Sequence, residues 1–172
     1  IGACASGGSE CAAKMSEIMG VKAEAFTRKV ALVKCSGQKT YNEVGEQIGG
    51  AKVKGIYEGF KNCLAASKVG GNGPVSCKYG CLGFGTCVKA CKYGAIKVEN
   101  GVAHVDEDLC VGCMACAAAC PRGLIVPVEP GHNVVIACNS LAKGAVTNRG
   151  CTVGCVGCGL CTKICPNDAI TV

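Results

Sequence analysis

Cysteine spacing is the feature that most constrains what this chain can fold into. Two runs have the spacing C-x2-C-x2-C-x3-C-P, the first ending at Pro121 and the second at Pro166. In such a run three thiolates on a tight loop bind one [4Fe–4S] cluster, while the fourth reaches a neighbouring cluster. Two copies in one chain therefore predict iron–sulfur chemistry. The eight thiols are Cys110, Cys113, Cys116 and Cys120, then Cys155, Cys158, Cys161 and Cys165.

An internal repeat relates these runs to an earlier part of the chain. Residues 76–98 align without a gap on residues 150–172, and 11 of the 23 positions are identical. A third, shorter copy begins at Cys110. The sequence therefore predicts a series of cluster-binding half-motifs rather than a single site.

The copy that begins at Cys77 departs from the pattern, because Phe84 stands where the repeat has Cys158. Cys77 precedes Cys81 by four residues and can supply the missing thiolate. A competing arrangement puts Cys77 on a separate cluster with Cys35 and Cys63. Since the fourth thiolate of each run crosses to the other cluster, we expect one cluster on Cys77, Cys81, Cys87 and Cys120, and another on Cys91, Cys110, Cys113 and Cys116.

The remaining cysteines are harder to assign. The run from Cys155 would hold a third cluster through Cys155, Cys158 and Cys161, with Cys165 reserved for a partner cluster. At least three clusters are therefore expected, and four or more remain open. Cys4 and Cys11 receive no assignment from spacing. Four cysteines outside the runs are either small buried hydrophobic residues or further ligands: Cys35, Cys63, Cys138 and Cys151.

Composition supports a metal-dependent fold. Only 4% of residues are aromatic, tryptophan is absent, and 26 of the 172 residues are glycine. A sequence so poor in large apolar side chains buries too little surface to be stable by packing alone. Disulfide scaffolds are typically shorter secreted proteins, and zinc ribbons use isolated C-x2-C pairs, so both explain the cysteines less well.

Charge and hydropathy exclude several classes of function. The formal net charge of +6 compensates for buried anionic clusters, and the basic residues are not interleaved with aromatics as in nucleic-acid binders. No segment approaches the roughly 18 to 20 apolar residues that span a bilayer. The first residues, 1–9, lack the basic start and apolar centre of a signal peptide. His104 and His132 have no partner at metal-ligand spacing, and no nucleophile–base pair or phosphate-binding loop is present.

The sequence predicts an α+β fold made of bacterial 2[4Fe–4S] ferredoxin-like modules with a small N-terminal α/β region. We expect an N-terminal region over 1–74, a ferredoxin-like module over 75–130, and the first half of a second module over 131–172. The glycine-rich stretch 70–74 marks the first boundary.

Local patterns predict the individual elements. We expect a first helix that Ser9 caps and Gly20 ends, a strand over Val30–Val33 leading to Cys35, and a short helix over 60–68. The turn residues Glu99–Asn100–Gly101 predict a hairpin between 95–98 and 102–105. In the same way, 124–128 and 134–138 flank a turn that contains Pro130 and Gly131.

A basic segment lies beside the first cluster motif. Between residues 60 and 97 there are six lysines and no acidic residue. These lysines form either a solvated face or a docking surface for an acidic redox protein. They are Lys61, Lys68, Lys78, Lys89, Lys92 and Lys97.

The order of these motifs resembles the B subunit of the Rnf complex, an ion-translocating ferredoxin:NAD oxidoreductase, in its long, cluster-rich form from anaerobic bacteria. The resemblance rests on the segments 4–8, 14–20 and 77–83 and on the two cysteine runs, and it extends over nearly the whole chain. It implies that the chain is a fragment or the ordered part of a longer subunit. In that family Cys4 would be the last ligand of a small Fe–S domain that follows a membrane anchor.

The resemblance also implies a role. The Rnf B subunit would accept electrons from reduced soluble ferredoxin at the cytoplasmic face of the membrane and pass them to other Rnf subunits. The chain itself shows no substrate chemistry. One alternative is a polyferredoxin-like electron-transfer subunit of a hydrogenase or another dehydrogenase, and one of a different class is a zinc-stabilised interaction module.

Overall fold

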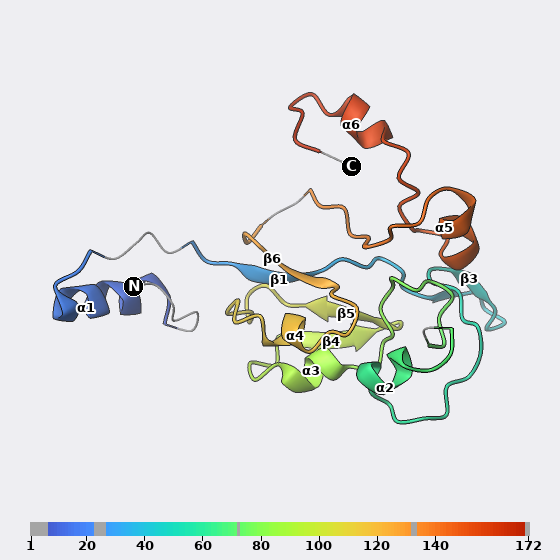
Figure 1. The fold of residues 1–172 in the computed structure, drawn as a ribbon, viewed down its shortest axis with the longest axis horizontal. Coiled ribbons are helices and arrows are strands. Elements are labelled where there is room, and N and C mark those ends of the chain that lie inside the picture. Colours follow the sequence, from blue (N-terminus) through green and yellow to red (C-terminus); the bar gives the residue numbers. More distant parts are fainter. Residues whose placement is uncertain (1–6, 23–26, 72, 132–133, 171–172) are drawn as a thin grey trace.

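Short helices and two-stranded antiparallel sheets make up the chain, which confirms the expected α+β, ferredoxin-like class (Figure 1). The computed structural model describes residues 7–22, 27–71, 73–131 and 134–170. Cys4 and His132 lie outside the described residues. The helices are α1 (Gly8–Met19), α2 (Cys63–Ser67), α3 (Thr86–Ala90), α4 (Ala115–Ala118), α5 (Ala145–Gly150) and α6 (Leu160–Ile164). The strands are β1 (Val30–Val33), β2 (Thr40–Tyr41), β3 (Gln47–Gly49), β4 (Ile96–Glu99), β5 (Val102–Val105) and β6 (Ile125–Val128).

Strand β1 forms where the sequence predicts it, but its partner comes from far along the chain. β1 pairs antiparallel with β6, with Val30 opposite Val128 and Val33 opposite Ile125. The N-terminal region thus shares a sheet with the central module, across the expected boundary near residue 74. The division into 1–74, 75–130 and 131–172 stays a prediction about sequence units.

The expected pairing of 124–128 with 134–138 is wrong. β6 pairs with β1, whose residues are mostly buried, whereas residues 134–136 are exposed and would cover β6 less well. Cys138 instead forms an isolated antiparallel bridge with Cys35. The two segments that lead to these cysteines therefore approach each other across the end of the β1–β6 sheet.

The β4–β5 hairpin confirms the turn prediction. Ile96 pairs with Val105 and Glu99 with Val102, and the two residues between the strands have positive φ angles, 47° at Asn100 and 79° at Gly101. Two such residues are typical of the turn whose twist matches that of a hairpin.

Two of the predicted helices are present with shifted bounds. α1 begins at Gly8, so Ser9 lies inside the helix rather than capping it, and Gly20 ends the helix in the left-handed conformation as expected. α2 occupies the centre of the predicted 60–68 segment. It begins after Asn62, whose side chain accepts a hydrogen bond from the Leu64 amide at 2.7 Å.

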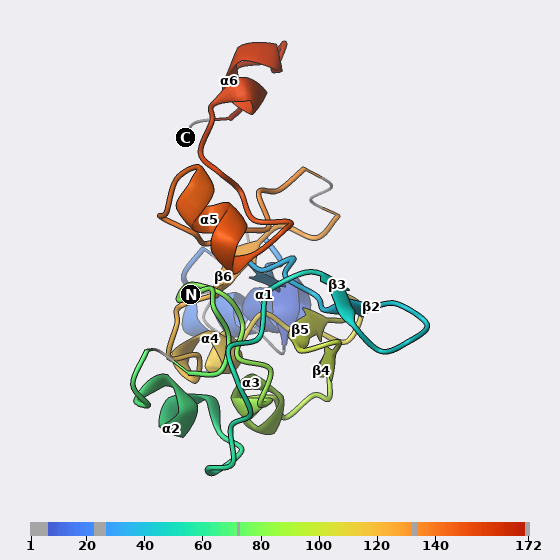
Figure 2. The same ribbon diagram turned by 90° about the vertical axis from the view of Figure 1, so that its right-hand side faces the viewer.

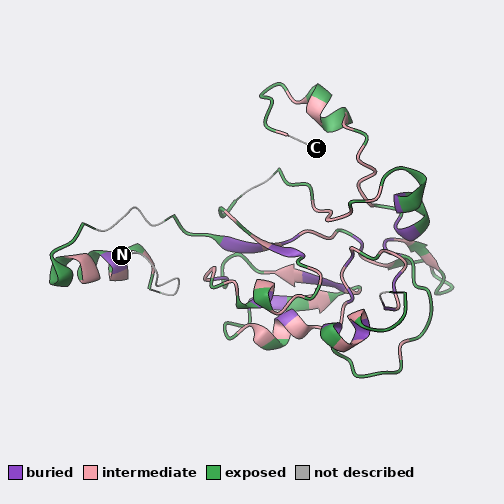
Figure 3. Cartoon of the chain, viewed as in Figure 1, coloured by how far each residue is buried: buried purple, intermediate pink, exposed green. Residues whose placement is uncertain are grey.

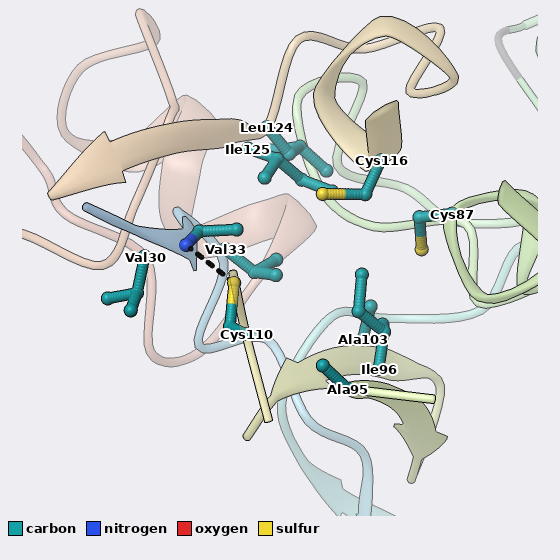
Figure 4. Packing of buried hydrophobic residues seen from close by; sticks show 11 residues of the cluster. Val30, Val33, Cys87, Ala95, Ile96, Ala103, Cys110, Cys116, Leu124 and Ile125 are labelled. Atoms are coloured by element: carbon teal, nitrogen blue, oxygen red, sulfur yellow. Dashed lines mark hydrogen bonds between the residues drawn. The ribbon is translucent and has the colours of Figure 1, made fainter. Parts of the chain in front are cut away.

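The hydrophobic core contains small side chains and thiols in place of large aromatics. Around β1 it combines valine, isoleucine and leucine side chains with three thiols that are 6–9% exposed, Cys87, Cys110 and Cys116 (Figure 4). The largest side chains that are fully buried are valines. Burial is concentrated around this sheet, whereas α6 is exposed (Figure 3). The central thiols are thus part of the core itself.

Candidate iron–sulfur sites

Three cysteine runs share one local backbone design, and they are numbered in chain order as the first from Cys81, the second from Cys110 and the third from Cys155. Helices α3, α4 and α6 each follow a residue in the left-handed conformation, with φ of 69° at Gly85, 57° at Met114 and 69° at Gly159. In each run, the glycine two residues earlier also has positive φ. Two such residues bend the chain into a tight loop just before the helix, which brings the cysteines of loop and helix close together.

The first four-thiol pocket lies between α2, α3 and the segment after α4. Its remaining lining is mainly apolar and includes Val33, Leu82 and Leu124. The space between its atoms, open solvent included, is about 360 Å³. The four thiols are those of Cys63, Cys81, Cys87 and Cys120.

Cys63, and not Cys77, is the fourth thiol in this pocket, which differs from the grouping expected from the sequence. The amide of Cys63 donates a hydrogen bond of 2.8 Å to Oγ1 of Thr86, so the start of α2 is fixed against the start of α3. Phe84 packs at the edge of the same region, its ring centroid 5.2 Å from that of Tyr57. Linear spacing could not find Cys63, because the contact joins residues far apart in sequence.

The second pocket of the central module brings together the four thiols that the spacing groups. It lies beside β1 and β4, with about 300 Å³ between its atoms. The amide of Ala31 donates to Sγ of Cys110 at 3.4 Å, as the dashed line in Figure 4 shows. Ligation itself stays a prediction. The thiols are those of Cys91, Cys110, Cys113 and Cys116.

The third run is far more exposed than the first two. Cys158 and Cys161 are exposed, and Cys155 and Cys165 are partly so. Figure 2 shows α6 projecting away from the sheets. A third cluster on Cys155, Cys158 and Cys161 stays a prediction.

Cys77 lies in a different pocket from the one expected. It lines a pocket near the end of β1 together with Cys35, Cys138 and Cys151, which are three of the four cysteines that no motif covers. Every cysteine outside the runs from Cys35 onward therefore lies beside other thiols, in this pocket or, for Cys63, in the first one. Cys11 lies on α1, away from these pockets.

Burial raises the pKa of five of the pocket thiols, those of Cys35, Cys81, Cys87, Cys116 and Cys151. It raises the pKa of Cys87 to about 11, and nearby Cys81 and Cys63 add to the shift. Burial likewise raises the pKa of Cys151, to which Cys77, Cys35 and Cys138 add in turn. Metal ligation needs thiolates, so cluster binding must displace protons from these sites. Cys165, on the partly exposed third run, differs, because hydrogen bonding, first from the Ala169 amide, lowers its pKa.

Arg122 supplies positive charge between two pockets. Its guanidinium lines the first pocket and donates to the carbonyl oxygens of Cys77, at 2.8 Å, and Gly80. Burial lowers its pKa, while the nearby thiols, first Cys77, raise it. Among the described residues, no carboxylate lines any of the three multi-thiol pockets. Such surroundings fit an anionic group.

The donor set fits cubane clusters better than single metal ions. Within the described parts of the chain, no three histidine, cysteine or carboxylate groups converge as a mononuclear zinc site requires. A [4Fe–4S] cluster takes four cysteine thiolates around its whole surface. Four thiols around an apolar pocket provide that arrangement.

Comparison with protein families identifies the same regions. Three segments match families described as 4Fe–4S binding domains: residues 81–95, 102–125 and 154–171. These matches confirm the expected iron–sulfur chemistry and the expectation of at least three clusters.

The chain is also similar over its full length to curated subunits. It is 38% identical to the B subunit of the Na(+)-translocating ferredoxin:NAD(+) oxidoreductase complex of Acetobacterium woodii and 43% identical to the proton-translocating counterpart of Clostridium ljungdahlii, with 100% and 98% of this chain covered. The B subunit of the ion-translocating oxidoreductase complex of Methanosarcina acetivorans is 34% identical over 100% of the chain. The chain spans 49%, 56% and 62% of these relatives. The similarity confirms the resemblance to the Rnf B subunit.

Proposed function

We propose that this chain is the cluster-bearing, electron-transferring part of a B subunit in an Rnf-type ferredoxin:NAD oxidoreductase complex. The two four-thiol pockets of the central module carry the proposal. The similarity to B subunits along the whole chain supports the proposal that the complex is of the Rnf type. When bound, [4Fe–4S] clusters would take up and release single electrons.

The chain's own residues would hold and shield these clusters. Cys87 and Cys116 bring ligands into the core, where Leu124 and Ile125 exclude water. Low solvent access and hydrogen bonds to sulfur both set the reduction potential of such sites. The Ala31 amide would therefore help to set the reduction potential of a cluster in the second pocket. The charge of Arg122 would do the same in the first pocket.

Exposed lysines of the first module support reduced ferredoxin as the electron donor. Lys89 lies on α3 next to the buried Cys87, and Lys78 and Lys92 are exposed on the flanking loops. Lys97, by contrast, forms an ion pair of 3.0 Å with Glu99. A small acidic protein that docks on these lysines would approach the first module.

Stopped-flow oxidation of reduced ferredoxin by the cluster-loaded chain tests this proposal. Rapid reduction of the chain is expected, and replacing Lys78, Lys89 and Lys92 with glutamate should slow it roughly tenfold at low salt, because electrostatic steering is lost. A control charge reversal at Lys14 and Lys22, on and just after α1, should leave the rate near that of the wild type. Equal rates for the two variants would contradict the docking surface.

A second candidate keeps the electron-transfer role but changes the partner. About half of the chain is 38% identical to the B component of the polysulfide reductase of Wolinella succinogenes and 35% identical to a thiosulfate reductase electron transfer subunit of Salmonella typhi. A reductase or hydrogenase partner would leave the clusters intact but make the chain unreactive toward ferredoxin. The same stopped-flow experiment separates these cases.

The proposed complex is associated with a membrane. The names of two of the full-length relatives describe ion translocation, which requires a membrane. Within the described residues no helix has the length and apolar character to cross a bilayer. From the similarity to subunits of ion-translocating complexes, we propose that this part of the subunit lies at the cytoplasmic face and meets the membrane through other Rnf subunits or another part of its own subunit.

A further inference from the structure

We infer that Cys35, Cys77, Cys138 and Cys151 form an additional [4Fe–4S] site, placed between the first module and the third cysteine run. All four line one pocket near the end of the β1–β6 sheet. No family match covers any of them, since the matched segments are 81–95, 102–125 and 154–171. The space between the pocket's atoms, about 360 Å³, equals that of the first four-thiol pocket.

The site is built from two equivalent halves. Cys77 and Cys151 occupy the same position in the internal repeat, in which residues 76–98 align on 150–172. Cys35 and Cys138 face each other across an antiparallel bridge. Each of these two also donates its amide to the carbonyl two residues earlier, at 2.8 Å in both cases. Each half therefore contributes two thiols, Cys35 and Cys77 from one half and Cys138 and Cys151 from the other.

The hydrogen bonds to sulfur follow the same two-fold relation. The Cys81 amide donates to Sγ of Cys35 at 3.4 Å, and the Cys155 amide donates to Sγ of Cys138 at 3.3 Å. Cys81 and Cys155 are themselves equivalent in the repeat. Two independent parts of the chain thus direct an N–H group at a sulfur of the same pocket, as expected where sulfurs carry negative charge.

Backbone pairing holds the two repeat-related thiols side by side. Residues 50–52 lie between the two segments that carry these thiols. The Lys52 amide donates a hydrogen bond of 3.0 Å to the carbonyl oxygen of Gly150, and the Ser76 amide donates one of 2.7 Å to the carbonyl oxygen of Lys52. The Thr152 amide also donates a hydrogen bond of 3.1 Å to the carbonyl oxygen of Gly50. The positions of Cys77 and Cys151 are therefore fixed by a ladder of main-chain bonds, independent of any bound group.

Charge and position give the site a role, which rests on the proposed electron-transfer function. Lys34 lines the pocket and Arg122 holds the carbonyl of Cys77, whereas no carboxylate among the described residues lines it. Cys81 belongs to the first pocket and Cys155 to the third run, so the site adjoins a predicted cluster on each side. It would accept one electron from the reduced cluster of the first module and give one to the cluster of the third run, with no bond or proton transferred.

Iron and sulfide analysis of anaerobically reconstituted variants tests the site. Cys138→Ala and Cys151→Ala each leave every family-matched motif intact and should each lose about four irons per chain, together with the corresponding EPR signal of the reduced protein. The matched control Cys11→Ala removes a thiol on α1 and should lose none. Unchanged iron content and EPR intensity in Cys138→Ala and Cys151→Ala would overturn the inference.

A second measurement covers variants that fail to fold. In the wild-type cluster-loaded protein, Cys35, Cys77, Cys138 and Cys151 should resist alkylation by iodoacetamide and become reactive together when a chelator removes iron. Alkylation of these thiols in the loaded protein would overturn the site. Cys110→Ala separates the two proposals: if it loses iron while Cys138→Ala does not, this inference fails and the proposed function stands. A wild-type protein without iron and sulfide would contradict both.

Discussion

Helices α3 and α6 contain the same cysteine motif but lie in different surroundings. They are equivalent in the repeat, and both follow a glycine with a φ of 69°. Yet Cys87 on α3 is 7% exposed and belongs to the core, whereas its equivalent Cys161 on α6 is exposed. The local conformation is therefore encoded by the motif, while burial is not.

The difference lies in what packs against each helix. α3 contacts α4 and β4, and the β1–β6 sheet covers the same core. Within the described residues, α6 has no buried residue. A half-motif thus places its thiols locally, but a second half and a sheet are needed to take them out of water.

Removal of iron should produce the largest difference between the central module and α6. Because the core of the central module is made of small side chains and thiols, we expect metal binding to supply much of its folding free energy. Anaerobic chelation should therefore abolish hydrogen-exchange protection in β1, β4, β5 and β6. Amides of α6 should exchange rapidly before and after chelation. Retained protection of the β4–β5 hairpin in the iron-free protein would contradict this account.

Equivalent cysteine substitutions sharpen the comparison. Cys87→Ala removes a thiol from the core and from the first pocket, and should lower the midpoint of thermal unfolding by about 10 °C. Cys161→Ala makes the same chemical change on an exposed helix and should lower the midpoint by less than about 2 °C. Differential scanning fluorimetry under anaerobic conditions measures both. Similar shifts for the two variants would mean that the third run is as integrated as the first module.

Equivalent glycine substitutions should have the smallest effect. Gly85→Ala and Gly159→Ala place a Cβ at the same positive φ, where neighbouring atoms stand no closer than 3.6 Å, so each adds mainly backbone strain of about 1 kcal/mol. In Gly85→Ala this strain should lower the free energy of global unfolding. In Gly159→Ala it should only speed hydrogen exchange in α6. Denaturant unfolding and hydrogen exchange would show whether the two strains are coupled to the fold as predicted.

Local features were predictable from the sequence. The turn at Asn100 and Gly101, the strand Val30–Val33 and the eight thiols of the two runs each depend on neighbouring residues, and the structure has the turn and strand where expected. The fold class followed from the cysteine runs because cluster-binding loops allow few architectures. Among the strands, the expectation that failed was the choice of partner for β6.

Long-range partners could not be predicted in the same way. The pairing of β1 with β6 and the position of Cys63 beside α3 both join residues far apart, and nothing in the spacing specifies them. One signal was available: the repeat makes Cys77 equivalent to Cys151, and a thiol shared by the two halves suggests a site of its own.

Anomalous diffraction at the iron edge, from crystals of the protein grown without oxygen, tests the central claim most directly. That claim is that buried thiols brought together by the fold, rather than those closest in sequence, complete the cluster sites. We predict iron bonded to Cys63 in the pocket of Cys81, Cys87 and Cys120, and a separate group of iron atoms bonded to Cys77. Iron shared by Cys77 and Cys81, with Cys63 left as a free thiol, would contradict it.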